Sequence, residues 1–216
     1  MRDDFTDITV VLDRSGSMAA VADDTIGGFN QFLLDQKRAP GDGVLTLVQF
    51  DNEYEFVHTA KPLGEVPPLS PATFIPRGST ALLDAINRAI GETHERIAKM
   101  DEAQRPGTVI VVILTDGHEN SSQEWTHEAV GKAIARQERD YAWDFVFLGA
   151  NMDAVAVGQQ MGFAADKSMT YAADSDAVGS AWAATSGYVA RRNAAPIGAE
   201  VPGFSDEERA AAGGRR

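Results

Sequence analysis

The chain of 216 residues contains no cysteine, few basic residues and no long apolar run. Without cysteine it has neither a disulfide framework nor a thiol nucleophile. Lys and Arg number 19 against 32 Asp and Glu, which gives a net charge of -13. This charge argues against a protein that binds nucleic acid or an anionic membrane surface, because it would be repelled by either polyanion. A basic partner or a bound cation fits the composition better.

Membrane and secretion signals are also missing from the sequence. No apolar stretch approaches the roughly 20 residues that a membrane span needs, and the opening MRDDFTD lacks the basic-then-apolar pattern of a secretory signal. We therefore expect a cytoplasmic protein, unless the chain is a mature fragment from which a leader was removed. The length and the 44% hydrophobic content suit one domain with one core.

Four short apolar runs, rich in Val, Ile and Phe, predict buried strands. They cover residues 8–13, 44–51, 108–117 and 143–150. Continuous apolar character indicates burial on both faces, as in a parallel sheet covered by helices. The run at 54–60 follows the second of these after a turn, DNE, that is too short for a crossover. We expect it to pair antiparallel at an edge of the sheet.

Apolar residues at helical spacing separate these runs. They predict helices around 26–33, 82–97, 125–134 and 178–189, with a short helix near 153–161 and a short strand at 168–171. Asp174 is the expected N-cap of the last long helix, and the three tryptophans are expected to be packing residues. The alternation predicts an α/β fold with a doubly wound, mostly parallel central sheet, one antiparallel edge strand and helices on both faces.

Two segments are expected to lie outside this core. Residues 60–79 are proline-rich and predict a long surface loop of the kind that shapes binding sites. We expect the domain to span residues 1–192 and residues 193–216 to form a flexible C-terminal tail. Within the tail, Ser205 and Glu208 have capping-box spacing, which favours a short helix at 205–212.

Oxygen-bearing side chains are expected to gather at one edge of the sheet. Asp13, Ser15 and Ser17 form the string DRSGS at the end of the first strand, Asp116 ends a later strand, and Thr80 stands in RGST at a helix start. The carboxyl ends of the strands form the ligand-binding edge of such a sheet. Two carboxylates and three hydroxyls are hard ligands that suit Mg²⁺, or Mn²⁺ or Ca²⁺, rather than Zn²⁺ or Cu²⁺. An ion held by few carboxylates would favour an anionic oxygen, such as a partner's Asp or Glu, at its open position.

The order DRSGS, GST and TDG resembles the metal-ion-dependent adhesion site, or MIDAS, of von Willebrand factor type A domains, and the resemblance covers residues 6–192. It implies a Rossmann-like fold in which Ser15, Ser17 and Thr80 are the hydroxyl ligands. Asp13 and Asp116 would act directly or through water and orient the serines. It further implies a non-enzymatic module that binds a protein partner through an acidic residue at the open metal position. The second metal site of some integrin relatives is not expected, because the following acids arrive late.

Several other interpretations are compatible with parts of this pattern. Asp, Ser and Gly are ordinary turn and N-cap residues, so DRSGS alone would fit a structural turn. A Mg²⁺-dependent hydrolase or phosphotransferase could use Asp13 as its nucleophile, although the second carboxylate typical of such phosphatases is replaced by Ser15. A nucleotide-binding protein is a third possibility by fold analogy alone, but the first strand–helix turn lacks G-x-G-x-x-G.

A few neighbouring residues have two readings each. His118 and Glu119 could line the site or belong to a solvated loop, and Asp51 could extend an acidic rim or form the hairpin turn. Arg77 could pair with an acidic partner or be an exposed loop charge. Glu207 or Glu208 of the tail could fill the open metal position, or be solvated. The sequence leaves the partner's identity and the oligomeric state open.

Overall fold

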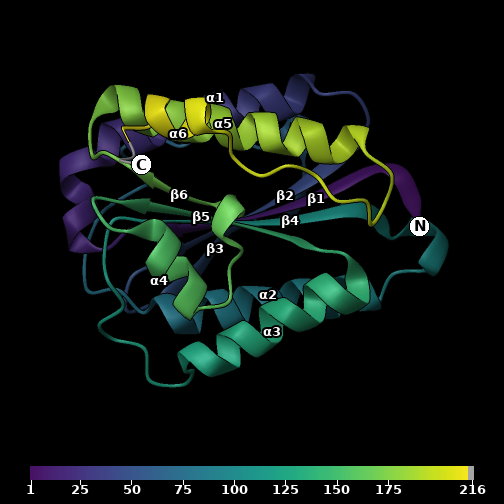
Figure 1. Cartoon of the computed structure of the whole chain (residues 1–216), viewed down its shortest axis with the longest axis horizontal. Helices are drawn as coiled ribbons and strands as arrows, with labels where there is room; N and C mark the ends of the chain where they lie inside the picture. The colour runs from purple at the N-terminus through teal and green to yellow at the C-terminus, as the bar shows by residue number, and fades with distance from the viewer. Residues whose placement is uncertain (214–216) are drawn as a thin grey trace.

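The computed structural model describes residues 1–213, which form a six-stranded sheet between two layers of helices (Figure 1). The strands are β1 (Arg2–Asp13), β2 (Asp42–Phe50), β3 (Tyr54–Pro62), β4 (Pro106–Thr115), β5 (Asp144–Ala150) and β6 (Ser168–Tyr171). The helices are α1 (Ala22–Arg38), α2 (Leu82–Ala98), α3 (His127–Tyr141), α4 (Ala154–Gln160), α5 (Ser175–Ala194) and α6 (Asp206–Ala211).

The strand order is β3-β2-β1-β4-β5-β6. All neighbouring pairs are parallel except β2 with β3, which pair antiparallel at the edge. Helices α1, α5 and α6 lie on one face of the sheet, and α2, α3 and α4 lie on the other (Figure 1). This confirms the expected doubly wound, mostly parallel α/β fold with one antiparallel edge strand.

Strand β1 lies at the centre of the sheet and shows why the strands are apolar throughout. Val10 and Leu12 pack into the core under α1 and α5, whereas Val11 packs into the core under α2 and α3. Successive side chains of a strand point to opposite faces, so both faces must be apolar when both are covered. The strand begins at Arg2, earlier than expected. Its polar start is accommodated because the buried Asp7 accepts two hydrogen bonds from Arg96, at 2.6 and 2.9 Å.

The contact between α1 and α5 depends on a glycine. A Cβ atom at Gly28 would lie 2.2 Å from Cδ1 of Trp182, which is far inside van der Waals contact. The indole of Trp182 also packs against Phe29 and Phe32, with ring centroids 5.9 and 5.1 Å apart. Gly28 therefore lowers the helix propensity of α1 but lets the two helices approach around a fully buried tryptophan.

The third predicted helix starts later than its apolar stripe suggested. Helix α3 begins at His127, and Thr126 is its N-cap, accepting a hydrogen bond from the amide of Ala129 at 3.3 Å. Trp125 precedes the helix and is 41% exposed. The expectation that Trp125 is a packing residue is therefore wrong, while Trp143 and Trp182 are buried as expected.

The segment after α5 packs against the domain, which differs from the expectation of a tail outside the core. The buried Arg192 donates to the carbonyls of Ala195, Pro196 and Ala199, and this holds residues 195–199 against the end of α5. Phe204 and Ala212 then join the core under α5. Helix α6 starts with the Ser205 capping box. Residues 214–216 of the expected tail lie outside the described residues.

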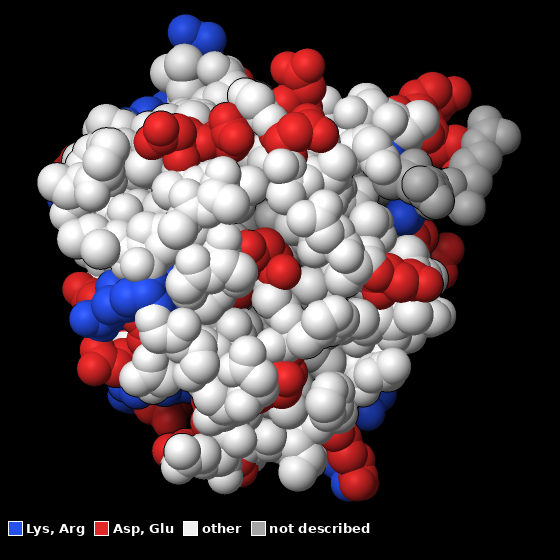
Figure 2. Space-filling view, turned by 90° about the vertical axis from the view of Figure 1, so that its left-hand side faces the viewer, with Lys and Arg blue, Asp and Glu red and all other residues white. Residues whose placement is uncertain are grey.

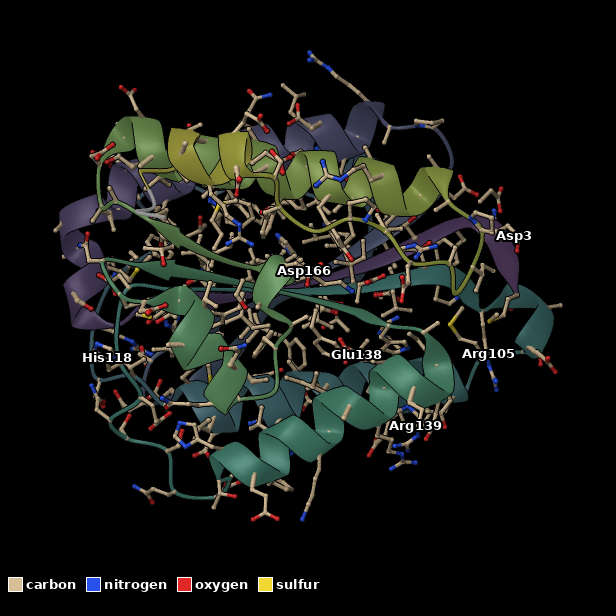
Figure 3. The ribbon with its side chains drawn as sticks, viewed as in Figure 1. Asp3, Arg105, His118, Glu138, Arg139 and Asp166 are labelled. Atoms are coloured by element: carbon tan, nitrogen blue, oxygen red, sulfur yellow. The ribbon has the colours of Figure 1, made fainter. Side chains whose placement is uncertain are left out.

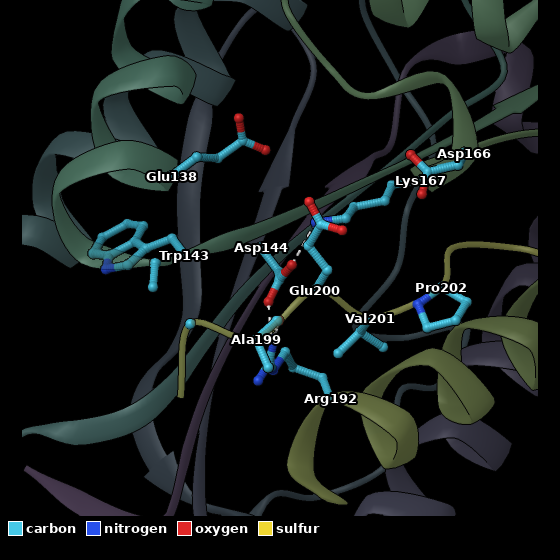
Figure 4. Close-up of a pocket in the computed structure, with 12 residues that line it drawn as sticks. Glu138, Trp143, Asp144, Asp166, Lys167, Arg192, Ala199, Glu200, Val201 and Pro202 are labelled. Atoms are coloured by element: carbon cyan, nitrogen blue, oxygen red, sulfur yellow. Dashed lines mark hydrogen bonds and ion pairs between the residues drawn. The ribbon is translucent and has the colours of Figure 1, made fainter. Parts of the chain in front are cut away.

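A cavity lies at the amino end of β5, away from the carboxyl ends of the strands where the oxygen ligands were expected. It measures about 790 Å³ between α3, β5 and the segment after α5 (Figure 4). Lys167 donates to Asp144 across its wall at 2.5 Å, and Tyr188 donates to the same carboxylate oxygen at 2.6 Å. Among the described residues, no helix is both long and apolar enough to span a membrane.

Candidate metal-binding site

The candidate site lies where β1 and β4 end. The loop after β1 continues into a 3-10 helix, Gly16–Val21, and is tied to the loop before α2 by a hydrogen bond from the amide of Gly16 to the carbonyl of Gly78, at 3.2 Å. His118 follows β4 at this end of the molecule, whereas Arg105 lies at the opposite end (Figure 3). Acidic side chains are spread over the end-on view, and basic ones lie mainly at its margins (Figure 2).

Short contacts connect four of the five predicted ligands. The amide of Ser15 donates to Oδ1 of Asp13 at 2.6 Å. The hydroxyl oxygens of Ser15 and Ser17 are 3.2 Å apart, and Ser17 donates to Oδ1 of Asp116 at 2.7 Å. The extended backbone of Ser15, with φ -58° and ψ 166°, turns the chain so that residues 13, 15 and 17 face the same region.

Thr80, the fifth predicted ligand, reaches this group across Gly117. A Cβ atom at Gly117 would lie 2.8 Å from Oγ1 of Thr80 and 3.6 Å from Oδ2 of Asp13, so both oxygens border the same small space. Asn120 fixes the backbone of Thr80, because its side chain accepts from the Thr80 amide at 2.9 Å and its own amide donates to the Thr80 carbonyl at 3.1 Å. The structure therefore brings all five predicted side chains to one place.

The carboxylates of the site are held in a weakly hydrated environment. Asp13 is fully buried, and this burial raises its pKa to about 6, with the negative charge of Asp116 acting in the same direction and hydrogen bonds from Thr115 and Ser15 opposing it. Burial also raises the pKa of Asp116 above its ordinary value, against the hydrogen bond from Ser17. Two adjacent carboxylates that are poorly solvated are destabilised as anions, and a divalent cation between them would relieve this cost.

Two further side chains, Thr115 and Tyr171, interact with the carboxylates of the site but were not predicted from the sequence. Thr115 donates to Oδ2 of Asp13 at 2.6 Å and orients that carboxylate. The hydroxyl of Tyr171, at the end of β6, is buried without a hydrogen-bond partner among the described residues. Burial, and then the charges of Asp116 and Asp13, raise the pKa of Tyr171. Thr115 directly precedes Asp116 and could have been noticed as a strand-end hydroxyl, whereas Tyr171 gives no sequence signal.

Most of the residues for which the sequence allowed either a role in the site or a structural role have structural contacts. Glu119 accepts from the amide of Leu83 at 2.9 Å and from the amide and hydroxyl of Ser122 at 2.7 Å. Burial works against it, but these hydrogen bonds lower the pKa of Glu119, so this carboxylate anchors the start of α2 to its loop. His118 is exposed. In the C-terminal segment, Glu208 accepts from the amide of Ser205 and pairs with Arg191.

Asp51 is a buried turn residue rather than part of an acidic rim. It is 1% exposed and accepts from the amide of Glu53 at 2.6 Å, as expected for the hairpin turn. Its Oδ2 atom also accepts from Nε of Arg14 at 3.0 Å and from Nε of Arg77 at 2.8 Å. Arg77 is half-exposed and pairs within the chain.

The donor set fits a hard cation better than a soft one. Within residues 1–213, no three His, Cys, Asp or Glu side chains gather closely enough to hold a metal by themselves. The site instead combines the carboxylates of Asp13 and Asp116 with three hydroxyls, and all of these are oxygen ligands of the type that Mg²⁺ and Ca²⁺ prefer.

Solved structures provide the comparison for this fold and site. No protein-family model matches the sequence, and no curated protein matches it either. Proximal thread matrix protein 1 from the mussel byssus is 15% identical, with a TM-score of 0.58 over 86% of this chain and 46% of that chain; it has also been solved with a zinc-occupied MIDAS motif. A von Willebrand factor type A protein from Catenulispora acidiphila is 12% identical, with a TM-score of 0.55 over 86% of this chain and 43% of that chain. The pilus adhesin SpaC from Lactobacillus rhamnosus GG, in its open conformation, is 16% identical, with a TM-score of 0.60 over 87% of this chain and 30% of that chain.

These similarities define the fold. The chain has the fold of a von Willebrand factor type A domain, as the motif resemblance implied. It spans less than half the length of each of the three proteins. A shared fold at such low identity does not determine function, which has to be argued from the site.

Proposed function

We propose that this protein is a non-enzymatic binding module that holds Mg²⁺ at a MIDAS and uses the ion to bind an acidic side chain of a protein partner. The observation that carries the proposal is the chain of contacts from Asp13 through Ser15 and Ser17 to Asp116, with Thr80 bordering the same space. The zinc-occupied MIDAS motif of the mussel protein supports a divalent metal at the corresponding edge of this fold.

The residues of the site would share the work of holding the ion. Ser15, Ser17 and Thr80 would offer hydroxyl oxygens, which carry no charge, and Asp13 and Asp116 would offer carboxylate oxygens directly or through water. Bound Mg²⁺ would supply an electrophilic centre that keeps water or exchanges it for an anionic oxygen. Thr115 would keep Asp13 oriented, because its hydroxyl already holds Oδ2 of that carboxylate.

The position of Asp13 also favours binding over catalysis. A nucleophilic carboxylate must be reachable by its substrate. Asp13 is fully buried, with Oδ1 bound by the Ser15 amide and Oδ2 by the Thr115 hydroxyl. These contacts support the role of a positioning group beneath a metal ion, rather than that of a group that attacks a phosphate.

Calorimetric titration with Mg²⁺ tests the proposal. The parent protein should bind one Mg²⁺ per chain, and Ser15→Ala and Asp116→Ala should each weaken the binding at least about tenfold. Ser175→Ala, which changes an exposed serine at the start of α5, is the matched control and should bind as the parent does. Equal Mg²⁺ binding by the parent and both site variants would refute the assignment.

A second measurement concerns the partner and the enzymatic alternative. Capture of a protein from the native host should require Mg²⁺, and it should be lost both in EDTA and with Ser15→Ala. A phosphatase and nucleotide-hydrolysis screen with Mg²⁺ should show no turnover. Turnover by the parent that is lost in Asp13→Asn would refute the non-enzymatic proposal and support a hydrolase that uses Asp13.

A further inference from the structure

A cavity lies beside the candidate metal site, on the side of the β3 edge. It measures about 360 Å³, within the range of small ligand pockets. Its lining residues are Arg14, Glu55, Val57, Ala72, Thr73, Ile75 and Arg77. Arg14 stands between Asp13 and Ser15 in the DRSGS string, and its carbonyl accepts from the amide of Arg77 at 2.7 Å. The same short string therefore carries three predicted metal ligands and one wall of this cavity.

The guanidinium of Arg14 is buried but not fully paired. Its side chain is 8% exposed. Nε donates to Asp51 at 3.0 Å and Nη1 donates to Glu55 at 2.7 Å, whereas Nη2 is buried with no hydrogen-bond partner among the described residues. A buried donor without a partner is costly. An arginine that binds a carboxylate through both terminal nitrogens makes a stronger and better oriented contact than one bound through a single nitrogen.

The two acids that cover the outer side of this cluster are exposed and replaceable. Glu55 is 58% exposed and reaches only Nη1 of Arg14. Glu53 is 65% exposed and binds Nη2 of Arg77. Ion pairs made by such exposed side chains contribute little stability. The buried Asp51 holds both arginines in place from beneath, so the guanidinium groups would stay ordered if Glu55 or Glu53 moved away.

We propose that this cavity binds a second carboxylate of the partner, which displaces Glu55 and is held by Nη1 and Nη2 of Arg14 together, with Arg77 beside it. The inference rests on the proposed function, since it assumes that the partner already places one acid on the metal. Val57 and the 59% exposed Ile75 offer an apolar wall for the aliphatic part of the acidic residue. Fixed arginines at this point also offset the repulsion between an acidic partner and a chain of net charge -13.

Acetate is a suitable probe because it presents one carboxylate and can be tested without metal. In EDTA at pH 7 and constant ionic strength, titration with sodium acetate should shift the NMR signals of the Arg14 Nε–H group and of the Thr73 and Ile75 amides. Glu55→Gln removes the internal competitor from an exposed position, and it should tighten acetate binding about threefold. Arg14→Lys keeps the charge but loses the planar fork, and it should weaken the binding about tenfold or more.

The controls separate this cavity from the metal site. Arg88→Gln changes an exposed arginine that pairs with Glu92 and should leave acetate binding unchanged. Mg²⁺ binding by calorimetry tests the metal site alone, and acetate binding in EDTA tests the cavity alone. Either assignment can therefore be refuted without the other. Unchanged acetate affinity in Glu55→Gln, or acetate shifts that do not involve Arg14, would overturn the proposal. Tighter binding of inorganic phosphate than of acetate would also overturn it.

Discussion

Replacing Asp13 by asparagine should stabilise the metal-free protein and abolish its response to Mg²⁺. Asp13 is 0% exposed, and an ionised carboxylate in such a position is poorly solvated. The amide has nearly the same shape and carries no charge. Its oxygen can still accept from the Ser15 amide. Its nitrogen can donate to Thr115, whose hydroxyl can turn to the carbonyl of Gly117 at 3.1 Å.

The magnitude follows from the pKa of Asp13, which burial raises from 3.8 to about 6. The folded protein then holds the proton more tightly than the unfolded chain does, so it binds more protons between pH 4 and pH 6. Stability therefore falls as the pH rises through this window. The difference corresponds to about 3 kcal/mol of destabilisation at pH 8, most of which is absent at pH 4. Asp13→Asn should recover about 1–3 kcal/mol of this at pH 8.

Urea unfolding in EDTA at pH 8 and at pH 4 measures the effect. The gain in unfolding free energy should be large at pH 8 and close to zero at pH 4. Addition of millimolar Mg²⁺ at pH 8 should stabilise the parent but not the variant. Asp23→Asn, which changes an exposed acid in the first turn of α1, should shift stability by less than about 0.5 kcal/mol at either pH. A variant that is less stable than the parent at pH 8, or equally shifted at both pH values, would refute the reasoning.

Three further substitutions test the fold and the site. Gly28→Ala should lower the unfolding free energy by about 1–2 kcal/mol in urea titrations, because a Cβ atom there would lie 2.2 Å from the indole of Trp182 in α5. The gain in helix propensity offsets only part of this strain. A more stable variant would contradict the close contact between α1 and α5. Arg96→Ala should cost about 3–5 kcal/mol in the same measurement, since it leaves the buried Asp7 carboxylate unpaired; a loss below about 1 kcal/mol would mean that this pair contributes little. Gly117→Ala should weaken Mg²⁺ binding at least about tenfold by calorimetry with little loss of stability. The reason is that the new methyl group would lie 2.8 Å from the Thr80 hydroxyl oxygen. Unchanged affinity would mean that the ion does not bind between Thr80 and Asp13.

The fold was accessible from the sequence because the strand signals are strong and local. Residues 145–150 are apolar and buried at every position, and such uninterrupted apolar runs occur where both faces of a sheet are covered. The three-residue turn before β3 forced an antiparallel edge strand, which the structure confirms. Boundaries were less accessible. The extension of β1 back to Arg2 depends on a distant partner for Asp7, and no local pattern signals it.

The wrong prediction for Trp125 also results from contacts between residues distant in sequence. Its spacing matches the stripe of α3, but the amides of residues 123–125 are held by Asp84 of α2, and the helix starts only after Thr126. The C-terminal segment was likewise expected to be separate, because its composition is polar and small. Arg192 of α5 binds the carbonyl of Ala199 in this segment, and Arg209 within it binds the carbonyl of Ser168 in β6. Such side-chain contacts to backbone carbonyls leave no periodic signal in the sequence.

The sequence by itself determined the alternation of strands and helices and the set of oxygen-bearing residues at the strand ends. Both follow from local chemistry, namely apolar periodicity and the short string that ends β1. Only the tertiary structure decided that Thr80 meets Asp13 across Gly117, that the buried Tyr171 is near enough to feel the charge of both carboxylates, and that Arg14 lines a cavity next to the site. These relations join chain segments tens of residues apart, and their distances are fixed by how the sheet and its helices pack.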